Sequence, residues 1–143
     1  LDGPFQFCYL QLGSKIERVY STIYDLKHSS LAGRKFDYVL LGDVLVHLLN
    51  PVQALAAAAE FAGGKLVISQ LMPEIETAHP VLQYVGGETL NEDDLSWFLP
   101  NFAFFRQFCR KLGFARVDEV GRNRGHLWPS GYEFDRSILL ASR

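Results

Sequence analysis

The hydrophobic and polar positions of this 143-residue chain alternate in a way that predicts strands followed by helices. Two short, mainly apolar runs, at 36–41 and 65–70, are typical of parallel strands covered on both faces. Apolar residues recur at spacings of three and four over 100–112, which predicts an amphipathic helix. The Ala-rich stretch 51–61 predicts another helix, with Asn50 as its N-cap and Pro51 in its first turn.

The rest of the pattern is assigned from weaker signals. We expect a helix over 4–12 that stops at Gly13, and Gly63-Gly64 and Gly113 should stop the two later helices. Further assignments are a strand at 15–20, a turn at 21–26, a polar connection at 28–34, a strand at 115–120, a Gly-rich loop at 121–131 and a strand at 134–141. The order favours an α/β fold with a parallel sheet. The last two strands have no helix between them, which predicts an antiparallel pair.

A long stretch, 71–90, has no clear period and contains Pro73, Pro80 and Gly86-Gly87. A connection of this length is usually functional or mobile, and we expect it to be the most mobile part of the chain. Residues 71–98 are predicted to form a lid over a binding site, with a short turn at 91–94.

The charge distribution is more informative than the net charge of −2, which gives no nucleic-acid footprint. Residues 71–94 hold six acids and no Lys or Arg, whereas residues 106–124 hold six basic residues and two acids. An acidic lid repels phosphate and favours a small neutral or cationic ligand, while the basic region argues in the opposite direction. Both regions are also compatible with ordinary solvated surfaces.

Other function classes find little support in the sequence. Cys8 and Cys109 lie in apolar surroundings typical of reduced core residues, and the four histidines have no metal-ligand spacing. No run reaches the length of a membrane span and no signal peptide is visible, so we expect a cytoplasmic protein. The oligomeric state is not indicated.

The stretch 36–51 is the most informative part of the chain. A strand that ends in Gly42-Asp43 is where open α/β sheets bind ligands, in the crevice beyond the carboxyl ends of the strands. His47, five residues beyond Gly42, could act as a general base near neutral pH, or pack and bond a backbone carbonyl. Asp43 could instead cap the turn that follows it.

Four pieces of the sequence resemble the later part of a class I S-adenosylmethionine-dependent methyltransferase, nearest to the tRNA wobble-uridine carboxymethyltransferase-like group. They are LGS at 12–14 with STIYDL at 21–26, the 36–51 stretch, GKLVISQ at 64–70, and WFLPNFAFFRQFCRKLGF at 97–114. The resemblance implies a Rossmann-like sheet of order 3-2-1-4-5-7-6, in which 15–20 is the third strand and 36–41 the fourth. It implies that residues 1–143 are the C-terminal part of one methyltransferase domain. The N-terminal strands and Gly-rich loop would precede Leu1, and the segment alone would be insoluble or partly folded.

The same resemblance assigns cofactor-binding residues. Ile23 and Tyr24 would flank the adenine, Asp25 would accept its amino group, and Gly42 would lie under the methionine portion beside Asp43. A carboxylate suits the task of Asp25 because it accepts hydrogen bonds without needing a proton. The alternative for Asp25 is a turn residue that bonds its own backbone.

The acceptor side is assigned in the same way. Arg136 matches an arginine that meets the carboxylate of a modified cofactor, but Val46 replaces the tyrosine that shares this task. Ordinary S-adenosylmethionine is therefore the expected cofactor. Tyr84, Trp97 and Phe98 would stack on the acceptor, with His47 and Asp43 as the candidate catalytic residues.

The favoured function is methyl transfer to a small-molecule acceptor, with nucleic acid as the less favoured partner. Transfer to tRNA and a non-catalytic scaffold with the same fold remain alternatives. A nicotinamide-linked dehydrogenase is weaker, because no Tyr-Lys pair at helical spacing is present.

Overall fold

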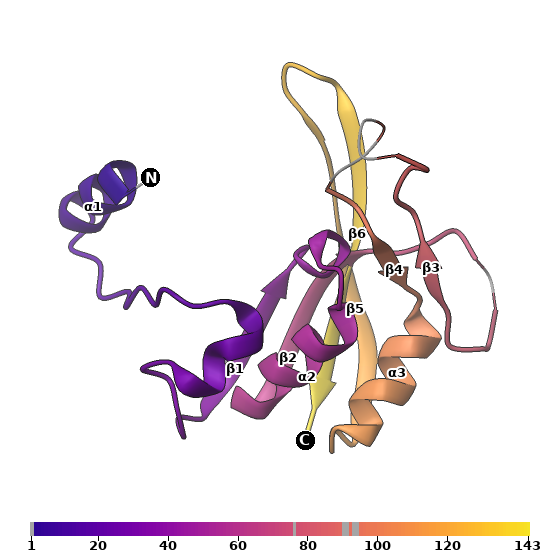
Figure 1. Ribbon diagram of the computed structural model, residues 1–143, viewed down its shortest axis with the longest axis horizontal. Helices are drawn as coiled ribbons and strands as arrows, with labels where there is room; N and C mark the ends of the chain where they lie inside the picture. Colours follow the sequence, from indigo (N-terminus) through magenta and orange to yellow (C-terminus); the bar gives the residue numbers. More distant parts are fainter. Residues whose placement is uncertain (1, 76, 90–91, 93–94) are drawn as a thin grey trace.

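The computed structural model describes residues 2–75, 77–89, 92 and 95–143 (Figure 1). A four-stranded sheet carries two α-helices, and another α-helix lies apart at the N-terminal end. The elements in chain order are α1 (Asp2–Gln11), the 3-10 helix η1 (Ile23–His28), β1 (Phe36–Gly42), the 3-10 helix η2 (Leu45–His47), α2 (Pro51–Phe61), β2 (Ala62–Leu71), β3 (Leu82–Tyr84), β4 (Phe98–Pro100), α3 (Phe102–Lys111), β5 (Arg116–Leu127) and β6 (Tyr132–Ser142).

The main sheet has the strand order β1-β2-β6-β5. β1 and β2 are parallel, with Gly42 opposite Ser69, so both strands end at the same edge. β6 runs antiparallel to both β2 and β5, which confirms the predicted antiparallel pair at the end of the chain. β3 and β4 form a separate two-stranded sheet.

The core lies between this sheet and the helices α2 and α3. Side chains that are fully inaccessible come from α2 (Leu55), α3 (Phe105 and Cys109) and the central strands (Leu66, Ile68 and Leu139). All belong to one hydrophobic cluster, so α2 and α3 cover the same face of the sheet. On the other face Tyr38 and Leu40 of β1 are 63% and 68% exposed, and the prediction that β1 is covered on both sides is wrong here.

Local sequence signals account for the helix ends. The Asn50 side chain accepts a hydrogen bond from Gln53 N–H, and Pro51 occupies the first turn of α2, as predicted. Asn101 caps α3 by accepting from Phe104 N–H at 2.9 Å, and it is almost fully buried. Gly13 and Gly113 follow α1 and α3 with φ of 55° and 90°, a region that a glycine enters without steric cost.

Three other assignments are wrong. Residues 15–20 contain no strand, because no described strand pairs with them. Residues 121–131 are mostly strand, since β5 continues to Leu127 and pairs with β6 as far as Tyr132. Gly63-Gly64 lie inside β2, and α2 ends before them at Phe61.

The long connection after β2 is partly ordered by the short strands β3 and β4. Asn101 fastens it to α3, because its side chain accepts from Val81 N–H at 3.0 Å and donates to the His79 carbonyl at 2.9 Å. The predicted turn at 91–94 falls mainly outside the described residues. The mobility of this connection stays a prediction, which hydrogen exchange measured against β1 would test.

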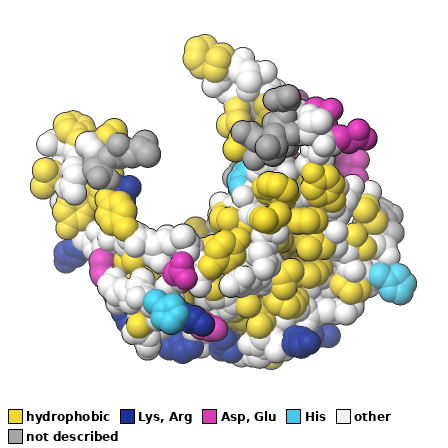
Figure 2. Space-filling view, viewed as in Figure 1, with side chains coloured by type: hydrophobic (Ala, Val, Ile, Leu, Met, Phe, Trp, Pro, Cys, Tyr) yellow, Lys and Arg dark blue, Asp and Glu magenta, His cyan; other side chains and the backbone are white. Residues whose placement is uncertain are grey.

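An apolar surface remains open beside this connection. Figure 2 shows yellow side chains gathered over α3 and its neighbouring segment. They include Phe104 and Phe108, whose rings stack at 5.3 Å, and Leu82, and all three line a groove of about 470 Å³. None of the described helices is long and apolar enough to cross a membrane.

The two cysteines are free but differ in their surroundings. Cys109 is buried in the core, as predicted, whereas Cys8 is exposed on α1. Burial raises the pKa of the Cys109 thiol from 9.0 to about 12, because the charged thiolate is disfavoured away from water.

We therefore expect one thiol per chain to react with Ellman's reagent at pH 8 in the native state, and two after denaturation. The raised pKa also means that the unfolded chain loses this proton first, so the contribution of Cys109 to stability falls as the pH rises from about 9 to about 12. Equal labelling rates for Cys8→Ser and Cys109→Ser variants would contradict this assignment.

Candidate functional site

The best-defined polar cluster lies at the edge where β1 and β2 end. Asp43 follows β1 directly and adopts φ of 52°, a conformation that is uncommon for a residue other than glycine. Its N–H donates to the Ser69 carbonyl at 2.6 Å, and its Oδ1 accepts from Leu71 N–H at 3.3 Å. Asp43 thereby ties the end of β1 to the end of β2.

The side chain of Asp43 also pairs with Arg136 of β6, through Oδ2 and Nε. The two side chains are only 21% and 23% exposed, so the pair is largely shielded from water. The Arg136 guanidinium lies 4.5 Å from the centre of the Phe134 ring, which further fixes its position. The alternative that Asp43 caps the next turn is wrong, because η2 has Val44 as its N-cap and no side-chain cap.

His47 ends η2 near this cluster in the sequence, and its ring is exposed. Its Nδ1 lies 2.9 Å from the Leu95 carbonyl oxygen. Because a carbonyl can only accept, Nδ1 carries the hydrogen, and Nε2 keeps a lone pair in the neutral ring. The structure therefore shows the carbonyl contact given above as the alternative, and it leaves Nε2 as a proton acceptor.

Two of the predicted stacking residues, Tyr84 and Phe98, lie on the β3–β4 sheet, and Trp97 directly precedes β4. The rings of Tyr84 and Phe98 meet edge to face at 5.7 Å, and the Tyr84 hydroxyl donates to the Gly87 carbonyl at 2.8 Å. Trp97 N–H donates to the Val46 carbonyl at 2.8 Å, which fastens β4 to η2. The three residues are therefore brought beside η2 by backbone and ring contacts.

One of the acidic side chains in the predicted lid, residues 71–98, takes part in local hydrogen bonds. Glu92 accepts hydrogen bonds from Glu88 N–H at 2.6 Å and from Thr89 N–H at 3.3 Å, so its carboxylate closes a turn. Asp93 and Asp94, which carried part of the prediction of an acidic lid, lie outside the described residues.

The predicted adenine-binding residues lie on η1. Tyr24 lines a small cavity of about 110 Å³ with Gln53, Ala56 and Ala57 of α2, and Ile23 packs against the core. Asp25 is exposed and accepts from the Thr22 hydroxyl at 2.7 Å. Residues 15–20 provide no strand end for these residues, so η1 is held by α2 instead of by the sheet.

Gly42 lies at the carboxyl edge of β1, and its backbone is accessible. A Cβ atom built at this position would meet no atom within 4 Å. A ligand can therefore lie directly against the backbone there, beside Asp43.

A second group of polar residues escaped the sequence analysis, because 121–131 was assigned to a loop. β5 and β6 extend together as a hairpin. Asp135 Oδ2 forms ion pairs with Arg122 Nη1 at 3.2 Å and with Arg124 Nε at 2.9 Å. Glu119 bonds Arg122 at 2.8 Å and raises the pKa of this guanidinium. The alternation of charged residues at 122–126 and 133–136 was the available signal. No group of three metal-ligating side chains occurs among the described residues.

Comparison with known proteins adds information at the level of the fold. No protein-family model and no curated protein sequence matches the chain. Among solved structures, the N-terminal domain of EvdMO1, in the presence of S-adenosylhomocysteine and D-fucose, aligns with 99% of the chain at 13% identity and a TM-score of 0.67. An O-methyltransferase family protein from Burkholderia thailandensis aligns with 99% at 16% identity and a TM-score of 0.62. Magnesium protoporphyrin IX methyltransferase from Synechocystis PCC 6803, with S-adenosylhomocysteine bound, aligns with 86% at 20% identity and a TM-score of 0.51.

The chain has the fold of an S-adenosylmethionine-dependent methyltransferase. It spans 61% of the EvdMO1 domain, 40% of the Burkholderia protein and 49% of the Synechocystis enzyme. The methyltransferase order 4-5-7-6 corresponds to the observed order β1-β2-β6-β5, so this part of the predicted sheet is confirmed. The nearer resemblance to the tRNA wobble-uridine group receives no support from these structures.

Proposed function

We propose that this chain binds S-adenosylmethionine at the carboxyl edge of β1 and β2 and serves methyl transfer to a small-molecule acceptor. The observation that carries the proposal is the alignment of 99% of the chain with the EvdMO1 domain. That domain and the Synechocystis enzyme were both solved with S-adenosylhomocysteine, the demethylated form of the cofactor.

The residues at this edge fit such a cofactor. The open backbone at Gly42 leaves room for the methionine portion beside Asp43. Ile23 and Tyr24 of η1 would contact the adenine, and the exposed Asp25 carboxylate would accept its amino group. Each of these assignments follows the resemblance in the sequence, and η1 is held by α2 at a defined place.

Methyl transfer requires little of the protein beyond aligning the methyl donor with the acceptor. Bound S-adenosylmethionine supplies a methyl group on a positively charged sulfur. The chain must hold the acceptor in line with it and exclude water. Asp43 already bonds Leu71 N–H and Arg136, so its role is to position this edge and not to move a proton. Where the acceptor must lose a proton, Nε2 of His47 is the group that would take it.

A small acceptor fits the segment beside η2. Tyr84, Trp97 and Phe98 offer aromatic surface, and Arg136 offers a guanidinium that is fixed by Asp43 and Phe134. The structural neighbours include proteins whose names refer to D-fucose and to magnesium protoporphyrin IX, both of which are small molecules.

Calorimetric titration of the purified protein with S-adenosylmethionine and S-adenosylhomocysteine tests the proposal. We expect binding of both, and we expect Asp25→Ala to weaken it by about 1–3 kcal/mol, the cost of leaving a polar group of the ligand without its partner. Asp37→Ala, which removes an exposed acid near the start of β1, is the matched control and should change nothing.

Two results would count against the proposal. Absence of heat with either compound would favour a non-catalytic scaffold with this fold. If Asp25→Ala binds S-adenosylmethionine with unchanged affinity, Asp25 is only a turn residue that accepts a hydrogen bond from Thr22.

A further inference from the structure

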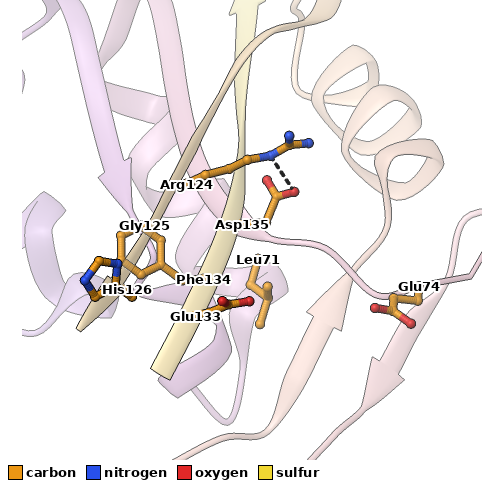
Figure 3. Close-up of a pocket in the computed structure, with 8 residues that line it drawn as sticks. All are labelled: Leu71, Glu74, Arg124, Gly125, His126, Glu133, Phe134 and Asp135. Atoms are coloured by element: carbon orange, nitrogen blue, oxygen red, sulfur yellow. Dashed lines mark hydrogen bonds and ion pairs between the residues drawn. The ribbon is translucent and has the colours of Figure 1, made fainter. Parts of the chain in front are cut away.

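The extended β5–β6 hairpin encloses a polar groove that none of the assignments above uses. Two adjoining cavities of about 600 and 390 Å³ share Leu71, Glu74 and Asp135. Figure 3 shows that Arg124, Asp135 and Glu133 come from the hairpin, while Leu71 and Glu74 belong to β2 and the segment after it. We call this space the hairpin groove.

Free hydrogen-bond donors lie on one wall of the hairpin groove. Arg124 donates to Asp135 through Nε alone, at 2.9 Å. Its two terminal nitrogens have no partner among the residues that the structure describes. Arg122 uses Nε toward Glu119 and Nη1 toward Asp135, so it is more fully engaged.

Free acceptors are interleaved with these donors. Asp135 receives both arginines on Oδ2, while its Oδ1 is buried and has no partner among the described residues. A buried carboxylate oxygen without a donor is costly, and it points to a water or ligand group that completes it. Glu74 and Glu133 also line the groove without a hydrogen-bond partner in the described part of the chain.

The charges in the hairpin groove select against anions. Arg122 and Arg124 are already matched by Glu119 and Asp135, so the unmatched groups are the carboxylates of Glu74 and Glu133. A phosphate or carboxylate that reaches the terminal nitrogens of Arg124 would still meet an excess of negative charge, because four carboxylates surround two guanidinium groups. Hydroxyl groups suit the groove better, because each can donate to a carboxylate and accept from a guanidinium.

The remaining walls and the position of the groove narrow the ligand further. Phe134 alternates with Glu133 and Asp135 along β6, and Figure 3 shows its ring on the opposite side of the strand, so the apolar surface that the C–H face of a sugar-like ring can cover is the side chain of Leu71. The Phe134 ring lies under Arg136, and Leu71 of the groove is held by Asp43 through its N–H. The hairpin groove therefore adjoins the edge at which we place the cofactor.

We infer that the hairpin groove binds a neutral, polyhydroxylated ring of about the size of a monosaccharide, carried by the methyl acceptor. That the ring belongs to the methyl acceptor rests on the proposed function. The groove and its hydrogen-bonding groups do not depend on that function.

Saturation-transfer NMR with the purified protein tests the inference, using D-glucose, D-galactose and D-xylose as neutral probes and D-glucose 6-phosphate as the anionic counterpart of the first. We expect transfer to at least one neutral sugar and a weaker signal from the phosphate. Arg124→Gln and Glu133→Gln should each weaken the binding of the responding sugar about tenfold, the loss expected for one hydrogen bond to a charged group.

Glu17→Gln is the control, because Glu17 is an exposed acid that pairs with Arg34 in the segment before β1. Absence of transfer to any neutral sugar, or tighter binding of the phosphate, would overturn the inference. Equal weakening by Glu17→Gln would overturn the placement in the groove. Titration with S-adenosylhomocysteine separates the two proposals. Cofactor binding without sugar binding refutes only the proposal that the hairpin groove binds a sugar. Sugar binding without cofactor binding refutes the proposal that the groove is part of a methyl-acceptor site.

Discussion

Phe105→Ala is expected to lower the free energy of unfolding by about 3–5 kcal/mol. Phe105 of α3 is fully buried, and it belongs to the cluster that joins both helices to the sheet. Its ring also meets Phe104 edge to face at 5.9 Å. Truncation removes apolar surface that had left water and opens a cavity that a packed core only partly refills. Since domains are stable by about 5–15 kcal/mol, a loss of this size threatens the native state.

Phe7→Ala is the matched control for Phe105→Ala. The same side chain is 65% exposed on α1, so its truncation should change stability by less than about 0.5 kcal/mol. Chemical denaturation followed by circular dichroism measures both variants. Equal effects of the two substitutions would mean that α3 does not pack on the sheet as described.

Asp43→Ala is expected to lower the free energy of unfolding by about 2–3 kcal/mol. This is near the lower end of the range for breaking a buried ion pair, because the two side chains remain about one-fifth exposed. The substitution leaves the guanidinium of Arg136 shielded and without its carboxylate, and it leaves Leu71 N–H without an acceptor. Asp43→Asn should cost less, since its amide oxygen still accepts from Leu71.

The control for Asp43→Ala is Asp37→Ala on β1, the strand that Asp43 follows, where the side chain is exposed and little change is expected. The double variant Asp43→Ala/Arg136→Met should recover part of the loss, because it removes the unpaired charge as well. The denaturation midpoints of the four variants (Asp43→Ala, Asp43→Asn, Asp37→Ala and the double variant) measure these changes in stability. A double variant less stable than Asp43→Ala would show that Arg136 stabilises this edge without its partner.

The two main helices could be predicted because their signals are local. Asn50-Pro51 starts α2, and the Phe spacing with Gly113 defines α3 and its end. Hydrogen bonds and apolar faces within a helix depend on residues three and four apart, which are visible in the sequence.

Strands were harder to predict because a strand exists only where another strand pairs with it. Residues 15–20 alternate like a strand but find no described partner, whereas residues 121–127 look like a loop and yet pair with β6. The hairpin groove was missed for the same reason, since Arg124 and Asp135 meet only in that pairing.

The sequence by itself determined the α/β class, the start of α2, the end of α3 at Gly113, and Gly42-Asp43 at the end of a strand, whereas the predicted start of α3 at Pro100 is wrong because Pro100 belongs to β4. It could also name Asp43 and Arg136 as candidates, but it assigned them to different tasks. Only the tertiary structure decided that these residues, 93 positions apart, form one ion pair. The physical reason is that β6 inserts antiparallel beside β2, and this sheet order brings the start of the last strand to the edge where β1 ends.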